Sequence, residues 1–180
     1  MVVPAAMVAV ASNGFPESTA MTAQDLPMGD KHDFDFLAGT WIGENRRLRK
    51  RWVGSDDWDV FPGHLRCALH MNGLVNVEEV TFPTRGFIGM TVRLFDHVER
   101  RWSIYWINSE RAVFYPPMRG GFTGDQGVFF GEETDDGQLV KVRFRWTKRG
   151  RDSARWEQAF SRDGESWEWN WSCDFTRTGD

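Results

Sequence analysis

Short runs of alternating apolar and polar residues, each ended by a turn signal, dominate the chain from residue 40 onward. In the run 139–147, Val140, Val142 and Phe144 alternate with basic residues, and the run 87–96 alternates in the same way. Alternation with a period of two is typical of β-strands that bury one face. Because no stretch with a helical period competes with it, the pattern predicts an all-β fold.

The number and spacing of these runs indicate how the strands are arranged. Asn72-Gly73 is a strong hairpin signal, and further Gly-containing turns follow at regular intervals. A long antiparallel meander leaves two edge strands, and closure into a barrel removes them. We therefore predict a single antiparallel up-and-down barrel of about ten strands. The predicted strands are 40–53, 58–71, 74–82, 87–96, 101–108, an irregular 113–122, 127–134, 139–147, 154–161 and 167–176.

The stretch 32–41 is predicted to close one end of this barrel. Phe34, Phe36 and Leu37 are apolar within one short turn, after which a glycine breaks the turn and Trp41 opens the first strand. We expect a short N-terminal helical turn to lie across the barrel end. The barrel domain would then span residues 32–180.

Residues 1–31 are predicted to form a flexible leader, because they are low in complexity. In an alternative prediction, Phe15, Met21, Leu26 and Met28 fold over the barrel mouth as a lid. The apolar start of the leader lacks the positive region of a secretory signal. No run of the chain approaches the roughly 18 apolar residues of a membrane helix. We expect a cytoplasmic protein without a membrane partner.

Charge and metal-ligand content exclude several function classes. The net charge of −4 does not suggest a nucleic-acid partner. The basic run 46–51 lies on a predicted strand, where successive side chains point to opposite faces and form no continuous basic surface. Cys67 and Cys173 are too few for a disulfide framework or a four-thiolate zinc site, and we expect reduced core residues. The four histidines have no metal-ligand spacing, so no metal is expected.

The segment 36–41, Phe-Leu-Ala-Gly-Thr-Trp, resembles the Gly-x-Trp entry of the calycins, the group of lipocalins and fatty-acid-binding proteins. Over residues 32–177 the chain is similar to an uncharacterised bacterial domain-of-unknown-function family with that fold. The segments that carry this similarity are 32–37, 93–96, 102–106, 143–146, 155–161 and 175–177.

The resemblance implies a calycin barrel but no established activity. It also implies that Arg177, near the end of the last strand, packs on the entry residue Trp41. Related nitrobindin-type barrels hold haem through a histidine late in the chain, whereas no histidine follows His97 here. We therefore expect neither haem nor any other cofactor.

Strand parity predicts which side chains face the barrel interior. The chain has 10 Trp and 14 Phe, and many of these rings share one parity with aliphatic residues. They either pack the interior solid or wall a pocket for a flat apolar molecule. The predicted ligand-binding residues are Trp41, Asn76, Met90, Ile104, Trp106, Phe144, Trp146, Trp156, Gln158, Trp169 and Trp171.

Glu78 shares this inward parity and is a candidate catalytic residue. A carboxyl group surrounded by aromatic rings would have its pKa raised by desolvation and could act as a general acid or base. In the alternative interpretation Glu78 is a structural group paired with an arginine, as buried charges usually are. If a bulge inverted the parity, the polar residues of the opposite face would line the pocket and favour an anionic ligand. This set is Arg143, Arg145, Glu157, Glu168, Asn170 and Asp174, together with Tyr105.

Three functions follow from these alternatives. The first is binding of a small, largely apolar or aromatic molecule inside the barrel. The second is a cofactor-independent enzyme, such as an isomerase, cyclase or hydratase, that acts on a hydrophobic substrate. The third is a structural role with a solid core, in which a homodimer forms through an exposed strand face.

Overall fold

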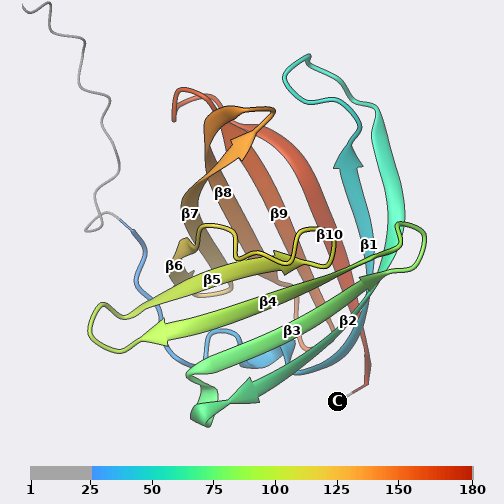
Figure 1. The fold of residues 1–180 in the computed structure, drawn as a ribbon. Coiled ribbons are helices and arrows are strands. Elements are labelled where there is room, and N and C mark those ends of the chain that lie inside the picture. Colours follow the sequence, from blue (N-terminus) through green and yellow to red (C-terminus); the bar gives the residue numbers. More distant parts are fainter. Residues whose placement is uncertain (1–25, 180) are drawn as a thin grey trace, which may run out of the picture.

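The structure is a computed structural model that describes residues 26–179, and ten antiparallel strands close into one barrel (Figure 1). Each strand pairs with the next along the chain, and β1 closes the barrel against β10. The prediction of an all-β up-and-down barrel is therefore confirmed. The strands are β1 (Gly39–Leu48), β2 (Trp58–His70), β3 (Val75–Phe82), β4 (Phe87–Asp96), β5 (Arg101–Asn108), β6 (Met118–Thr123), β7 (Gln126–Asp135), β8 (Gln138–Lys148), β9 (Ser153–Ser161) and β10 (Glu168–Gly179).

Tight turns join consecutive strands as hairpins, and most of these turns contain a residue with positive φ. Asn72 has φ 55° between β2 and β3, and Gly164 has φ 87° between β9 and β10. Asparagine and glycine tolerate this left-handed region better than other residues. The predicted strand 40–53 is too long: β1 ends at Leu48, and Trp52 lies in the following loop with φ 66°.

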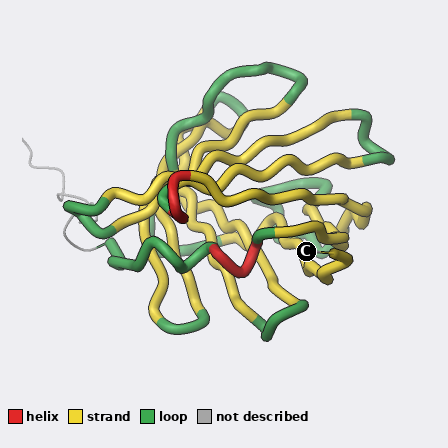
Figure 2. Tube along the Cα trace, turned by 90° about the horizontal axis from the view of Figure 1, so that it is seen from below, coloured by secondary structure: helices red, strands yellow, loops and turns green. Residues whose placement is uncertain are grey.

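The 3-10 turn η2 (Asp35–Leu37) lies across one end of the barrel, which Figure 2 views from below. A second 3-10 turn, η3 (Met71–Gly73), joins β2 to β3 beside it. Phe34, just before η2, is fully buried and packs edge-on against Trp102 and Phe122 at centroid distances of 5.0 and 5.1 Å. Leu37 is also fully buried. The expected helical closure is therefore present, as an isolated 3-10 turn that seals this end with aromatic packing.

The contact between Trp41 and Arg177 anchors the first strand to this turn. The indole Nε1 donates to the Leu37 carbonyl at 2.9 Å, and the Arg177 guanidinium lies 4.2 Å from the indole centroid. Arg177 also donates to the carbonyls of Ala38 and Phe36 at 2.5 and 2.6 Å. Stacking and charge-assisted hydrogen bonds together tie both chain ends of the barrel to its closed end.

The last residues before the barrel lie beside this closed end. The Leu26 carbonyl accepts from Arg101, and the Trp102 indole donates to the Asp30 carbonyl at 3.0 Å. Of the alternative lid residues, Leu26 and Met28 lie in this described segment, whereas Phe15 and Met21 lie outside the described residues, so the leader or lid stays a prediction. No helix among residues 26–179 is long and apolar enough to cross a membrane.

Cys67 and Cys173 are free and buried in the core, as predicted. Burial raises the pKa of Cys67 to about 12 and that of Cys173 well above its ordinary value. Both thiols therefore stay protonated at neutral pH and serve as small apolar residues.

Candidate functional site

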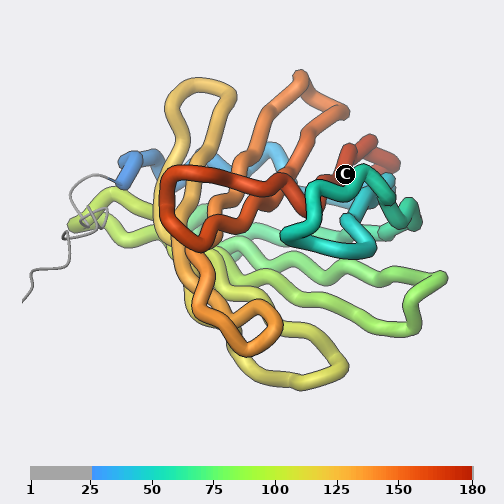
Figure 3. The backbone as a smooth tube through the Cα atoms, turned by 90° about the horizontal axis from the view of Figure 1, so that it is seen from above, coloured from blue at the N-terminus to red at the C-terminus, as the bar shows by residue number. Residues whose placement is uncertain are grey.

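A cavity of about 350 Å³ occupies the barrel interior between the 3-10 turn and the opposite, open end. Figure 3 views the barrel from above, with the β1–β2, β5–β6 and β9–β10 connections on different sides of it. This volume lies within the usual range for small-molecule sites. Aromatic rings and polar or charged side chains share its wall, and the polar ones include Asn45, Arg93 and Gln158. The main rings are those of Phe82, Phe87, Trp106, Phe144, Trp146, Trp156, Phe160, Trp171 and Phe175.

Most of the predicted ligand-binding residues lie on this cavity. They come from strands on opposite sides of the barrel, so that rings from β5, β8, β9 and β10 converge on one space. The predicted residues that line it are Ile104, Trp106, Phe144, Trp146, Trp156, Gln158 and Trp171, together with the catalytic candidate Glu78.

Two predicted residues lie in the closed end instead of on the cavity wall. Trp41 is buried against the 3-10 turn, as described above. Asn76 is fully buried, donates to the Phe34 carbonyl at 3.4 Å and accepts from Arg93. Both side chains point inward, but they support the base of the cavity and do not line it.

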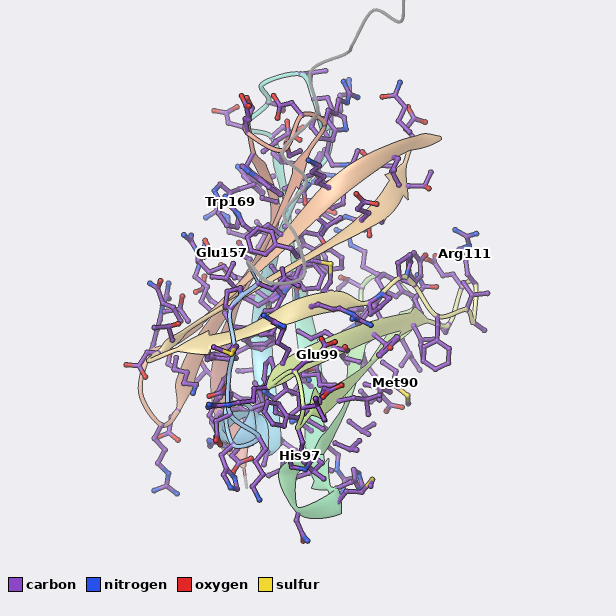
Figure 4. All side chains as sticks on the ribbon, turned by 90° about the vertical axis from the view of Figure 1, so that its left-hand side faces the viewer. Met90, His97, Glu99, Arg111, Glu157 and Trp169 are labelled. Atoms are coloured by element: carbon purple, nitrogen blue, oxygen red, sulfur yellow. The ribbon has the colours of Figure 1, made fainter. Side chains whose placement is uncertain are left out.

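Met90 is placed on the outer face of β4, contrary to the prediction (Figure 4). It pairs with Glu79 and Ile107, whereas its neighbour Thr91 is buried and lines the cavity. Hydrophobicity misleads here because the middle of β4 turns Thr91 and Arg93 inward, where they meet Glu78, and leaves Met90 outside.

Trp169 is also on the outer face, and a β-bulge is the cause. The pairing of β10 with β9 slips between Trp169 and Trp171, which inserts Asn170 as an extra residue. One extra residue reverses the side to which the following side chains point. The Trp169 ring is flanked by Arg143 and Arg145, whose Cζ atoms lie 4.8 and 4.4 Å from its centroid.

Of the alternative polar set, the bulge brings Asn170 inward, where it is buried and accepts from the cavity residue Gln158 at 2.9 Å, but it leaves the Arg145–Glu157 pair outside. Arg145 and Glu157 face each other across β8 and β9, and their side chains form an ion pair at 2.6 Å outside the barrel. Figure 4 shows Glu157 and Trp169 close together, on the side of the molecule opposite to Met90.

A polar network forms the base of the cavity. The Arg93 guanidinium donates to the Glu78 carboxylate at 2.5 Å and to Asn76 Oδ1 at 2.7 Å. The Thr91 hydroxyl donates to the other Glu78 oxygen at 3.3 Å. Arg93 also lies over the Phe34 ring at 4.9 Å. Glu78 therefore has the arginine partner of the structural interpretation, and Arg93 is a cavity residue that the sequence prediction missed.

Asn45 is a second missed residue on the wall. It is buried, and its Oδ1 accepts from the Trp171 indole at 3.0 Å, while its Nδ2 has no partner. Strict alternation from Trp41 through Gly43 assigns Asn45 to the inner face, but the basic residues that follow it obscured this parity. Asn45 offers a buried hydrogen-bond donor within the cavity.

Charged residues surround the open end. Arg51 forms an ion pair with Asp135, which also accepts from the Trp52 indole at 2.7 Å. Burial alone would raise the pKa of Asp135, but these hydrogen bonds hold it below its ordinary value. Burial, reinforced by repulsion from Asp135, raises the pKa of Glu133 to about 7, against the attraction of Arg51 and Arg47. This carboxyl is half-protonated near neutral pH.

Within residues 26–179, no group of three or more histidine, cysteine, aspartate or glutamate side chains could hold a metal ion. The site combines aromatic rings on its wall, the Arg93–Glu78 ion pair at its base and charged side chains at its mouth.

Comparison with known proteins adds no relative to this description. No protein-family model matches the chain, and no curated protein matches it. The similarity to a bacterial family of unknown function stays a prediction, and the barrel architecture rests on the strand pairing itself.

Proposed function

We propose that this protein is a calycin-like binding module that takes up one small, flat, largely apolar molecule inside its barrel. The observation that carries the proposal is the aromatic cavity of about 350 Å³, closed at the end where η2 lies. A preformed concave apolar site with a few polar groups is the usual form of a small-molecule site. The unpartnered Asn45 Nδ2 would favour a ligand with a hydrogen-bond acceptor.

The uncharged dye N-phenyl-1-naphthylamine tests this proposal, since it fluoresces in apolar surroundings and quenches nearby indoles. We expect saturable binding with one site per chain and quenching of tryptophan emission. Ile104→Phe, which fills the cavity, should weaken binding at least fivefold. Ile107→Phe is the matched control, because Ile107 lies on the outer face of the same strand, and should change affinity less than twofold. Absence of saturable binding to the wild type would reject the proposal.

A catalytic role is the second candidate, and Glu133 is the observation in its favour. A general acid or base works best when its pKa is near the working pH, as that of Glu133 is. The earlier candidate, Glu78, is held at the base of the cavity, where Thr91 and Arg93 donate to its two oxygens. Conversion of a bound compound by the wild type, lost in Glu133→Gln, would favour catalysis over simple binding.

A further inference from the structure

Arg47 is an exposed cation at the cavity mouth. It lies near the end of β1, two residues beyond Asn45, and lines the cavity. Its guanidinium carbon is 4.8 Å from the Trp171 ring centroid. Within the described part of the chain, Arg47 makes no side-chain hydrogen bond or ion pair, whereas Arg51 beside it is committed to Asp135.

The surroundings of Arg47 favour an anion. Desolvation, followed by repulsion from Arg51, lowers the pKa of Arg47, and an anion bound at the mouth would oppose both effects. A guanidinium stacked on an indole keeps its N–H edge free, and this edge fits a carboxylate or sulfonate. An anion bound there would sit beside the rings of the wall.

Glu133 is one of the carboxyl groups that attract Arg47, together with Asp135 and Glu110. It lines the same mouth as Arg47 and Arg51, with Asp135 on its own strand. Glu110 and Arg111, from the loop after β5, also line the mouth. Because the Glu133 carboxyl is half-protonated near pH 7, it neutralises Arg47 only in part at that pH.

We propose that the ligand of this barrel is an aromatic anion, whose rings lie among the indoles and whose negative group binds Arg47, and that Glu133 takes up a proton when this ligand binds. This inference rests on the proposed function and names its ligand class. An anion on Arg47 would repel the Glu133 carboxylate and so favour its protonated form.

Two matched dyes separate the anion site from the apolar site. 8-Anilinonaphthalene-1-sulfonate has the rings of N-phenyl-1-naphthylamine plus a sulfonate, so the ratio of their affinities reports the anionic contact. We expect Arg47→Met to lower this ratio at least tenfold in favour of the uncharged dye. Arg46→Met is the matched control, because Arg46 is exposed on the outer face near Trp58, and should leave the ratio within twofold.

The proton linkage is measured with the same sulfonate dye between pH 6 and pH 8.5. The sulfonate stays ionised throughout, so any change in affinity comes from the protein. We expect binding to weaken at least fivefold as the pH rises, since Glu133 then resists protonation. In Glu133→Gln the pH dependence should fall below twofold.

The outcomes distinguish the two proposals. If neither dye binds, the proposed function fails. If the uncharged dye binds but Arg47→Met and Arg46→Met have the same affinity ratio, the anion site is wrong and the binding function stands. A pH dependence that persists in Glu133→Gln would overturn the linkage. If Arg47→Met does not fold by circular dichroism, Arg47→Gln replaces it with the same expectation.

Discussion

Arg93 is almost fully buried, with 2% of the residue exposed, and its guanidinium is the central polar group of the barrel base. It neutralises Glu78, donates to Asn76 and lies over the rings of Phe34 and Trp146. A buried ion pair contributes little net stability, but removing one partner leaves an uncompensated charge. The pair therefore connects the closed end to the cavity and makes this region sensitive to single substitutions.

Arg93→Met should lower the free energy of unfolding by about 3–5 kcal/mol, because it leaves the Glu78 carboxylate buried without its cation. The double variant Arg93→Met/Glu78→Leu should recover at least about 2 kcal/mol of this loss, since it removes the charge as well. Urea unfolding followed by tryptophan fluorescence measures both. A double variant less stable than Arg93→Met alone would show that the carboxylate is not the source of the loss.

The Trp106 indole on β5 lies over Gly89 on β4, and this contact joins the two strands. A Cβ atom on Gly89 would come within 1.9 Å of Cη2 of Trp106, so any side chain at Gly89 displaces the ring. Trp106 is on the cavity wall, and its position therefore depends on the missing side chain of the neighbouring strand.

Gly89→Ala should destabilise the protein by about 1–3 kcal/mol, the usual cost of overpacking a well-packed site. In a Trp106→Leu background the same change should cost less than half as much, because the obstructing ring is gone. Thermal or urea unfolding of the four proteins completes this cycle. Equal costs in the two backgrounds would mean that the indole does not oppose the new methyl group.

The strands show how much of the fold the sequence can predict. The strand order follows from local signals, namely period-two alternation and turn residues such as Asn72, and these predicted the barrel. Placing side chains inside the barrel requires the parity of each strand. Parity read from hydrophobicity agreed with the structure at Phe144 and Trp146 on β8.

The same rule failed where the interior is polar or the register slips. At β4 the inward residue is Arg93, because its partner Glu78 lies on the adjacent strand, and Met90 is left outside. At Trp169 the bulge reverses the parity, and no local sequence signal marks it. Both features depend on how neighbouring strands pair, and the residues of one strand alone do not determine that pairing.

For the molecule as a whole, the two ends of the barrel are electrostatically different. The closed end is sealed by Phe34 and has its buried charges paired. The open end carries Glu133, whose pKa is raised to about 7. In contrast, backbone N–H groups hold the pKa of Asp163 and Asp96 below their ordinary values. These groups give opposite pH dependences to stability, in separate pH ranges.

The sign for Glu133 follows from linkage. The folded protein holds this proton more tightly than the unfolded chain, so the stabilisation is complete below about pH 4.5 and is lost as the pH rises through about 7. Asp163 and Asp96 act the other way, because the stability they contribute is lost only as the pH falls below about 4.

Between pH 5 and pH 8 the wild type should therefore lose about 1–3 kcal/mol of unfolding free energy relative to Glu133→Gln, which carries no titrating proton at this site. Urea unfolding of both proteins at matched pH values gives the difference curve and removes the titrations that they share. Parallel stability curves would show that Glu133 ionises at an ordinary carboxyl pKa. They would also remove the electrostatic basis for coupling protonation of the mouth to an anion on Arg47.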